Sequence, residues 1–164
     1  MRYRGFLALC SLFFLASSPA FAGSSSAIVE GFWRDVWQNK NPAAVDNYVI
    51  DDFIITSGGK DIRTREAFKK WIADFQSKIS DMKVEVIETF ENADGSRVVS
   101  RLRVTGKNNG MMGVDANQQP FVLTATAVWA VSADGKLEHN WVERNAWEVH
   151  GQIQGQIEGQ IQGK

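Results

Sequence analysis

The amino-acid sequence predicts one α+β domain, in which three N-terminal helices pack on an antiparallel β-sheet. Two observations predict this class. Apolar residues recur at helical spacing in the first half of the chain, and from Met82 onward they alternate with polar residues, as in strands that bury one face. A third observation, an apolar N-terminal segment followed by small residues, separates this domain from a leader.

The leader, residues 1–22, is interpreted as a secretory signal peptide. Arg2 and Arg4 precede an apolar run over residues 6–15, and Ala20-Phe21-Ala22 has the small residues of a cleavage site. The run is shorter than the roughly 20 apolar residues that a membrane span needs. We expect cleavage near Ala22, a periplasmic or secreted location and no membrane span in the mature form. Because Cys10 is the only cysteine, we also expect no disulfide.

The helices are predicted from spacing and capping signals. Six apolar residues between Ile28 and Trp37 form one stripe and predict a helix over residues 27–39. Asn41-Pro42 supplies an N-cap followed by proline and predicts a short second helix. Thr64 is the expected N-cap of the third helix, whose apolar residues again follow helical spacing.

The strands are predicted from alternation and turn residues. Residues 53–56 form a short strand that ends at the turn Ser57-Gly58-Gly59-Lys60. A hairpin then turns at Asn92-Ala93-Asp94-Gly95, and after a long loop over 106–119 two more strands follow, over 121–131 and from 136 to about 150. These last four strands are expected to form an antiparallel meander.

The domain is expected to span residues 23–150. Residues 151–164 repeat Gly-Gln-Ile-Gln or Gly-Gln-Ile-Glu, and a glycine in every fourth position disfavours a helix, which predicts a flexible tail. In the alternative interpretation, Ile153, Ile157 and Ile161 line one helical face that adds to a partner subunit.

Composition and motifs exclude several classes of function. The net charge is −1 at pH 7 and no cluster of Lys or Arg occurs, so we expect no nucleic-acid partner. The sequence contains no His-x-x-x-His, no phosphate-binding glycine loop and no Gly-x-Ser-x-Gly motif. We therefore predict no metal and no cofactor.

Three stretches carry a resemblance to a known family. They are residues 32–53, the run Ile62-Arg63-Thr64-Arg65-Glu66-Ala67-Phe68, and Asp134-Gly135-Lys136-Leu137 with Trp141 shortly after it. In this order they resemble the SnoaL-like branch of the nuclear transport factor 2 (NTF2)-like superfamily, over about residues 27–148. The resemblance implies an NTF2-like cone, in which a curved sheet and the helices enclose a pocket.

Members of the superfamily include cyclases, dehydratases, isomerases and epoxide hydrolases as well as proteins that only bind or dimerise, so the fold does not choose a function. The resemblance places the aspartate that serves cyclases as acid and base at Asn145 in this sequence. An amide has no proton to exchange near neutral pH, which argues against cyclase chemistry.

Alternation on the last strand gathers mixed polar and aromatic side chains on one face, namely His139, Trp141, Glu143, Asn145 and Trp147. This face is interpreted either as the wall of a pocket or as a subunit interface. His139 and Glu143 are candidate catalytic residues, but four residues along a strand separate them by roughly 13 Å. Each would need another partner, for which Asp51, Asp52 and Tyr48 are candidates.

Three functions remain open from the sequence. The first is a protein that binds a small apolar or aromatic molecule, with these residues at the ligand: Trp33, Trp37, Tyr48, Phe75, Trp141 and Asn145. The second is a cofactor-independent lyase, isomerase or hydrolase that uses acid and base residues in the same pocket. The third is a structural module that forms a homodimer through the sheet.

Overall fold

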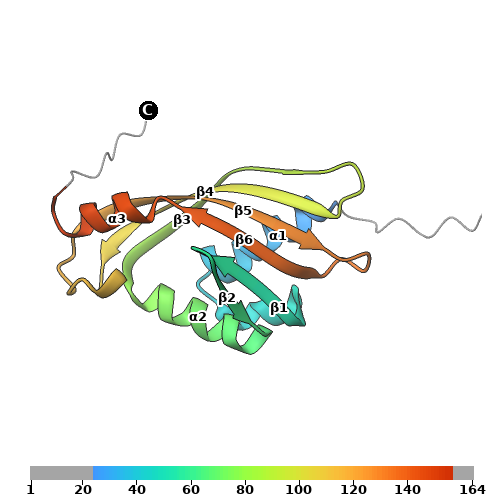
Figure 1. Cartoon of the computed structure of the whole chain (residues 1–164), viewed down its shortest axis with the longest axis horizontal. Helices are drawn as coiled ribbons and strands as arrows, with labels where there is room; N and C mark the ends of the chain where they lie inside the picture. Colours follow the sequence, from blue (N-terminus) through green and yellow to red (C-terminus); the bar gives the residue numbers. More distant parts are fainter. Residues whose placement is uncertain (1–23, 157–164) are drawn as a thin grey trace, which may run out of the picture.

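The computed structural model describes residues 24–156, which form three α-helices, three short helical segments and six strands (Figure 1). In chain order these are α1 (Ser25–Phe32), η1 (Trp33–Gln38), η2 (Pro42–Asn47), β1 (Val49–Ser57), β2 (Lys60–Arg63), α2 (Arg65–Ser77), β3 (Ile79–Glu91), β4 (Arg97–Asn108), η3 (Met111–Gly113), β5 (Pro120–Val131), β6 (Leu137–Arg144) and α3 (Ala146–Ile153). The predicted signal peptide, residues 1–22, lies outside the described residues.

The six strands form one sheet in the order β2-β1-β6-β5-β4-β3. The meander from β3 to β6 is antiparallel, as predicted, but β1 pairs in parallel with β6. The wholly antiparallel sheet expected from the sequence is therefore a mixed one. Strand β5 occupies one edge of β6, and β1 pairs with the backbone groups of the other edge. In this pairing Ile55 stands opposite Asn140.

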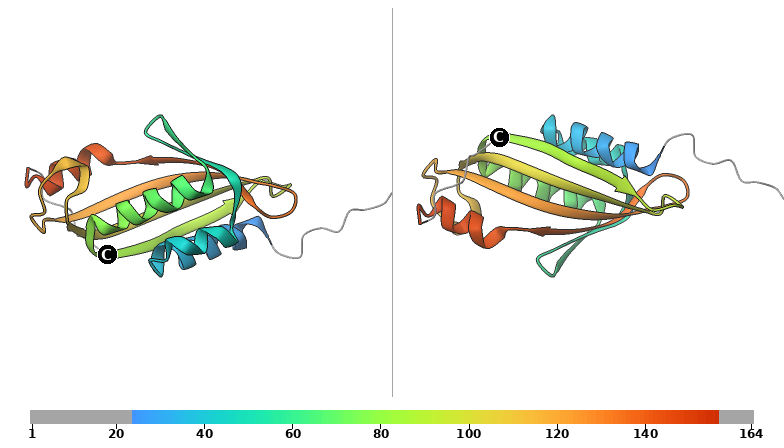
Figure 2. Two further views of the ribbon diagram at one scale, coloured as in Figure 1. Left: turned by 90° about the horizontal axis from the view of Figure 1, so that it is seen from below. Right: turned by 90° about the horizontal axis from the view of Figure 1, so that it is seen from above.

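The helices α1 and α2 cover the same face of the sheet (Figure 2). The Ser24 side chain accepts a hydrogen bond from the Ala27 N–H and caps α1. The chain then continues without a break into η1, a π-helical turn in which the Asn39 N–H bonds the Arg34 carbonyl. The single helix predicted over 27–39 thus changes its winding at Trp33.

The third predicted helix begins where expected. Thr64 accepts a hydrogen bond from the Ala67 N–H at 3.3 Å and caps α2. On its inner side α2 buries Phe68 and Ile72 completely or nearly so. Phe68 packs against Phe53 of β1 with a ring-centroid distance of 4.7 Å and the rings tilted by 38°, so that aromatic packing holds the helix on the sheet.

The structure corrects the sequence prediction after β6. The last strand ends at Arg144 instead of continuing to about residue 150, and α3 follows. Asn145 starts the turn, because its side chain accepts from the Thr124 N–H at 2.8 Å and donates to the Val122 carbonyl at 3.3 Å. These side-chain hydrogen bonds take the place of the next backbone hydrogen bonds between β6 and β5. The chain therefore leaves the sheet at Asn145.

Part of the predicted tail belongs to the domain. Gly151, Gln152 and Ile153 lie in α3 and are buried, Ile153 completely. The Gln152 side chain accepts from the Val122 N–H at 2.7 Å, and the Ile153 carbonyl accepts from the Asn117 side chain at 2.7 Å. The remainder of the repeat from residue 157 lies outside the described residues.

Two smaller differences concern loops. The predicted turn at 57–60 separates β1 from a strand that the sequence did not indicate, β2. The predicted long loop begins at Asn109, because β4 continues to Asn108, whose buried side-chain carbonyl accepts from the N–H groups of Gly110 and Met111.

Candidate functional site

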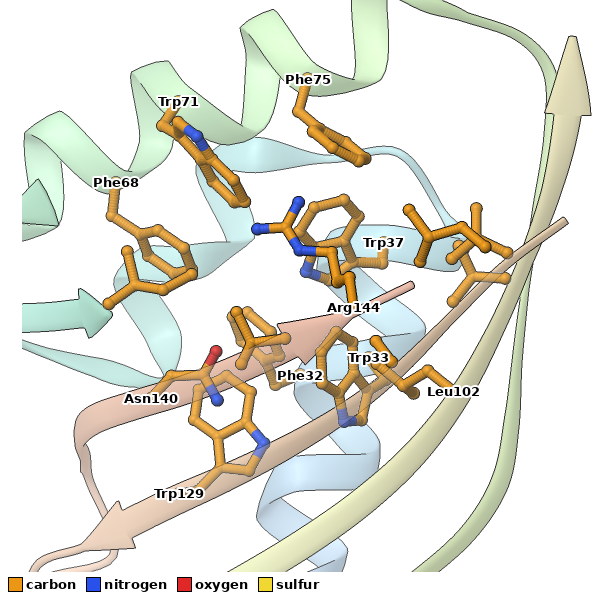
Figure 3. A pocket seen from close by; sticks show the side chains of 16 residues that line it. Phe32, Trp33, Trp37, Phe68, Trp71, Phe75, Leu102, Trp129, Asn140 and Arg144 are labelled. Carbon is orange, nitrogen blue, oxygen red and sulfur yellow. The ribbon is translucent and has the colours of Figure 1, made fainter. Parts of the chain in front are cut away.

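A cavity of about 50 Å³ lies between the helical layer and the covered face of the sheet. Side chains from α1, η1, α2 and five strands converge on it (Figure 3). Seven of the lining side chains are aromatic, namely Phe32, Trp33, Trp37, Phe68, Trp71, Phe75 and Trp129. The polar residues of the wall are Asn140 and Arg144, and the others are aliphatic.

Helical spacing brings the aromatic side chains together. Trp33 and Trp37 are one turn apart in η1, and Trp71 and Phe75 are one turn apart in α2. Trp37 meets Phe75 edge-on with a centroid distance of 5.7 Å and Trp71 with 6.2 Å. Aromatic contacts between η1 and α2 thus close the cavity on its helical side.

A groove of about 290 Å³ adjoins the cavity. The two hollows share four lining residues, which are Phe75, Leu123, Val142 and Arg144. The groove also has Met111, Met112 and Val149 in its wall, so it is mainly apolar, and the predicted catalytic residue Glu143 lines it as well. The cavity by itself is far smaller than the roughly 300–1,000 Å³ of ordinary ligand pockets, whereas the groove comes close to that range.

Strand β6 presents Asn140, Val142 and Arg144 to the cavity. The alternation predicted for this strand is present, but the cavity lies on the face opposite to the one that the sequence suggested. His139, Trp141 and Glu143 point the other way, and the Trp141 side chain is 38% exposed. Alternation separates two faces without saying which of them packs against the helices, and the aromatic face proved to be the outer one.

The Arg144 guanidinium lies above two aromatic rings of α2. Its central carbon is 5.4 Å from the ring centroids of both Trp71 and Phe75 (Figure 3). It donates a hydrogen bond to the Ser57 hydroxyl at the end of β1. Burial lowers the pKa of Arg144 below its ordinary value, and the neighbouring Glu143 acts in the opposite sense.

Indole N–H groups add to the polar character of the wall. Trp33 donates to the Ser100 hydroxyl at 3.1 Å. The buried N–H groups of Trp37 and Trp129 have no acceptor within residues 24–156. The Asn140 amide donates to the Val128 carbonyl at 3.2 Å. The wall is therefore richer in donors than in acceptors.

Three of the six predicted ligand contacts, Trp33, Trp37 and Phe75, line the cavity, whereas Tyr48, Trp141 and Asn145 do not. Asn145 anchors the end of β6, as described above. Tyr48 lies behind Phe32, meets its ring edge-on at 5.9 Å and donates to the Asp35 carboxylate. Burial, together with this hydrogen bond, raises the pKa of Tyr48 to about 12.

The two candidate catalytic residues, His139 and Glu143, do not form a pair in the cavity. The His139 Nε2 is 2.8 Å from the Thr56 hydroxyl, which donates to the Asp61 carboxylate at 2.6 Å. Burial lowers the pKa of His139, while Asp61 opposes the change. The His139 ring stacks on Trp141 at 3.8 Å, and Glu143 is exposed. Neither Asp51 nor Asp52 lines the cavity.

The sequence reasoning missed six of the aromatic and polar residues of the cavity wall, which are Phe32, Phe68, Trp71, Trp129, Asn140 and Arg144. Trp71 stands one helical turn before Phe75, and this spacing is a signal that could have found it. Arg144 carried no such signal, since an arginine near a strand end is most often solvated.

Two searches concern only the part of the chain that the structure describes. No group of three or more His, Cys, Asp or Glu side chains there is arranged to hold a metal ion. No helix within residues 24–156 is long and apolar enough to cross a membrane.

Solved structures share the fold at low sequence identity. A candidate SnoaL-like polyketide cyclase from Jannaschia sp. CCS1 has a TM-score of 0.73 and 17% identity, over 85% of this chain and 97% of that one. An LEH-like epoxide hydrolase from M. tuberculosis has a TM-score of 0.61 and 15% identity, over 79% of this chain and 84% of that one. A protein with a ketosteroid isomerase-like fold from Catenulispora acidiphila DSM 44928, solved in complex with trimethylamine, has a TM-score of 0.64 and 18% identity, over 77% and 92%.

A search of curated proteins finds no match. The family model of the SnoaL-like polyketide cyclases matches residues 27–153, from the first turn of α1 to the last residue of α3. Because this match covers most of the chain, the protein belongs to the SnoaL-like family and has its NTF2-like α+β fold.

Proposed function

We propose that this protein binds a small, largely apolar molecule in the cone cavity and the adjoining groove. The observation that carries the proposal is the composition of the cavity wall. Seven aromatic side chains line it, and none of its lining residues is a carboxylate or an imidazole. General acid and base catalysis needs such a group within hydrogen-bond reach of the substrate, so the wall favours binding over the lyase, isomerase or hydrolase alternative.

The sizes of the two hollows suggest how the ligand lies. The cavity of about 50 Å³ has room for a few heavy atoms, since one water site takes roughly 10–15 Å³ on this measure. The groove has room for the greater part of a small molecule. The ligand body is therefore placed against Met111, Leu123 and Phe75, with one end inserted into the cavity.

The proposal is tested with purified protein and four compounds, which are decanamide, decanoate, naphthalene-2-carboxamide and naphthalene-2-carboxylate. At least one of them is expected to raise the melting temperature and to be recovered unchanged by mass spectrometry. Trp71→Ala, which opens the aromatic wall, should weaken binding. Trp147→Ala is the matched control, because this tryptophan is 80% exposed on α3. Binding of none of the four would contradict the proposal, and conversion of a bound compound would favour the enzyme alternative.

We further propose that the protein is exported from the cytoplasm. The signal-peptide pattern at residues 1–22 supports a periplasmic or secreted protein that meets its ligand outside the cytoplasm. N-terminal sequencing of the protein recovered from the periplasm or medium should start at Gly23. Recovery of the intact chain from the cytoplasm would contradict export without affecting the binding proposal.

A homodimer through the helix-free face of the sheet is the remaining possibility from the sequence. Trp141 and Phe90 are partly exposed, at 38% and 53%, which supports such an interface. Sedimentation velocity at micromolar concentration tests it. A monomer for the wild-type chain would contradict the dimer, and a dimer that Trp141→Glu dissociates would support it.

A further inference from the structure

Arg144 is a partly buried cation without an anionic partner in the described part of the chain. Four other arginines of the domain are ion-paired, for example Arg65 with Asp51 at 2.5 Å and Arg101 with Glu88 at 2.6 Å. For Arg144 no carboxylate lies within 4 Å among residues 24–156, and its hydrogen-bond partner there is the neutral hydroxyl of Ser57. Burying an uncompensated charge is costly, so its retention calls for a specific role.

The surroundings hold the guanidinium in place and leave donors available. Trp71 and Phe75 support its face, each at 5.4 Å, and Ser57 takes one of its five N–H groups. The planar fork of a guanidinium matches the two oxygens of a carboxylate, and stacking on aromatic rings reduces the entropy lost when such a pair forms.

The position of Arg144 joins the two hollows. It lines both the cavity and the groove, together with Phe75, Leu123 and Val142. A molecule that spans them must pass the guanidinium. Among residues 24–156, the buried side-chain atoms of the cavity wall that lack a partner are the indole N–H groups of Trp37 and Trp129, which are also donors. The cavity wall therefore offers positive charge and hydrogen-bond donors among apolar side chains, and the carboxylate of the site, Glu143, lines the groove.

We propose that the ligand is an amphipathic organic anion, whose carboxylate or similar oxyanion is bound by Arg144 and whose apolar body lies against the aromatic wall and the groove. This inference rests on the proposed function, since it names the class of ligand for the same site. In this proposal, Arg144 makes the site bind acids more tightly than neutral molecules of the same shape.

Calorimetric titration with the matched pairs decanoate and decanamide, and naphthalene-2-carboxylate and naphthalene-2-carboxamide, tests the inference. The amide keeps the size of each acid but removes its charge. The wild-type protein is expected to bind at least one acid about 10- to 100-fold more tightly than its amide. A hydrogen bond to a charged group contributes affinity of this size. Arg144→Met should remove this preference, so that each acid binds no more tightly than its amide, whereas Arg144→Lys should keep part of the preference because the charge remains.

Arg103→Met is the matched control, because Arg103 stands on the opposite face of β4 from the cavity residues Leu102 and Val104. It should keep the full preference for acids. Circular dichroism and melting curves establish that each variant is folded. Equal binding of acid and amide by the wild type, or an acid preference that survives in Arg144→Met, would overturn the inference while the proposed function stands. Failure of all four compounds to bind would overturn the proposed function itself.

Discussion

Replacing Ile153 by alanine tests whether the start of the Gly-Gln-Ile repeat is part of the folded domain. Ile153 is completely buried at the end of α3, which packs on β5. The substitution removes three carbon atoms, worth roughly 0.8 kcal/mol each in transfer free energy, and leaves a space that the neighbours refill only in part. We expect the free energy of unfolding to fall by about 3 kcal/mol.

Urea unfolding followed by tryptophan fluorescence measures this change. With a slope of about 1–3 kcal/mol per molar for a domain of this size, the midpoint should fall by about 1–3 M. Gln154→Ala is the control, because Gln154 follows Ile153 directly and is exposed. It should change stability by no more than about 0.5 kcal/mol. If Ile153→Ala were as mild as the control, residues 151 onward would have to be detached, as the sequence pattern suggested.

Three further predictions follow from contacts at the edge of the site. Asn145→Ala removes the side-chain bonds to Thr124 and Val122, so chemical unfolding should show a loss of about 1–3 kcal/mol, while affinity for any ligand of the cavity changes less than about twofold. The pKa of His139 is lowered in the folded state, so protons bind the unfolded chain more tightly, and its contribution to stability is present above pH 6.5 and lost as pH falls. Urea midpoints between pH 5 and 8 should therefore fall more steeply with acid in the wild type than in His139→Gln, and equal slopes would refute this. Absorbance at 295 nm should titrate Tyr48 with a midpoint near 12 instead of the ordinary 10, and a midpoint near 10 would mean that the bond to Asp35 is absent in solution.

The helices and the meander could be predicted because their signals are local. Thr64 as N-cap, the apolar stripe from Ile28 to Trp37 and the hairpin turn at Asn92-Ala93-Asp94-Gly95 act within a few residues, and each stands where it was expected. The parallel pairing of β1 with β6 joins segments more than eighty residues apart in sequence. No local pattern specifies such a pairing, because it depends on which strand edge the rest of the sheet leaves open.

The end of β6 was mispredicted for a related reason. Trp147 and Val149 continue the alternation of a strand, but Val149 and Ile153 are also one helical turn apart, so both periods fit the same residues. The choice between them is made by Asn145 and Gln152, whose side chains bond the backbone of β5. That contact exists only in the folded domain, so the pattern alone favoured the wrong element.

The separation of ionisable groups from the cavity bears on the choice between an enzyme and a binding protein. His139, Thr56 and Asp61 form a hydrogen-bonded chain of the kind that can move a proton, but His139 stands on the face of β6 opposite to Asn140 and Val142. The backbone of the sheet thus lies between this chain and the aromatic cavity. Acid and base catalysis requires the proton-transferring group and the bound molecule on the same side.

Within the cavity, the ionisable group is Arg144, and a guanidinium stays charged under physiological conditions, even where burial lowers its pKa. It can hold an anion, orient it and stabilise its charge, but it is a poor proton acceptor. A SnoaL-like domain with an amide at position 145, no carboxylate in its cavity wall and, among residues 24–156, no ion-pair partner for Arg144 therefore supports the proposal that the protein retains an organic acid and does not transform it.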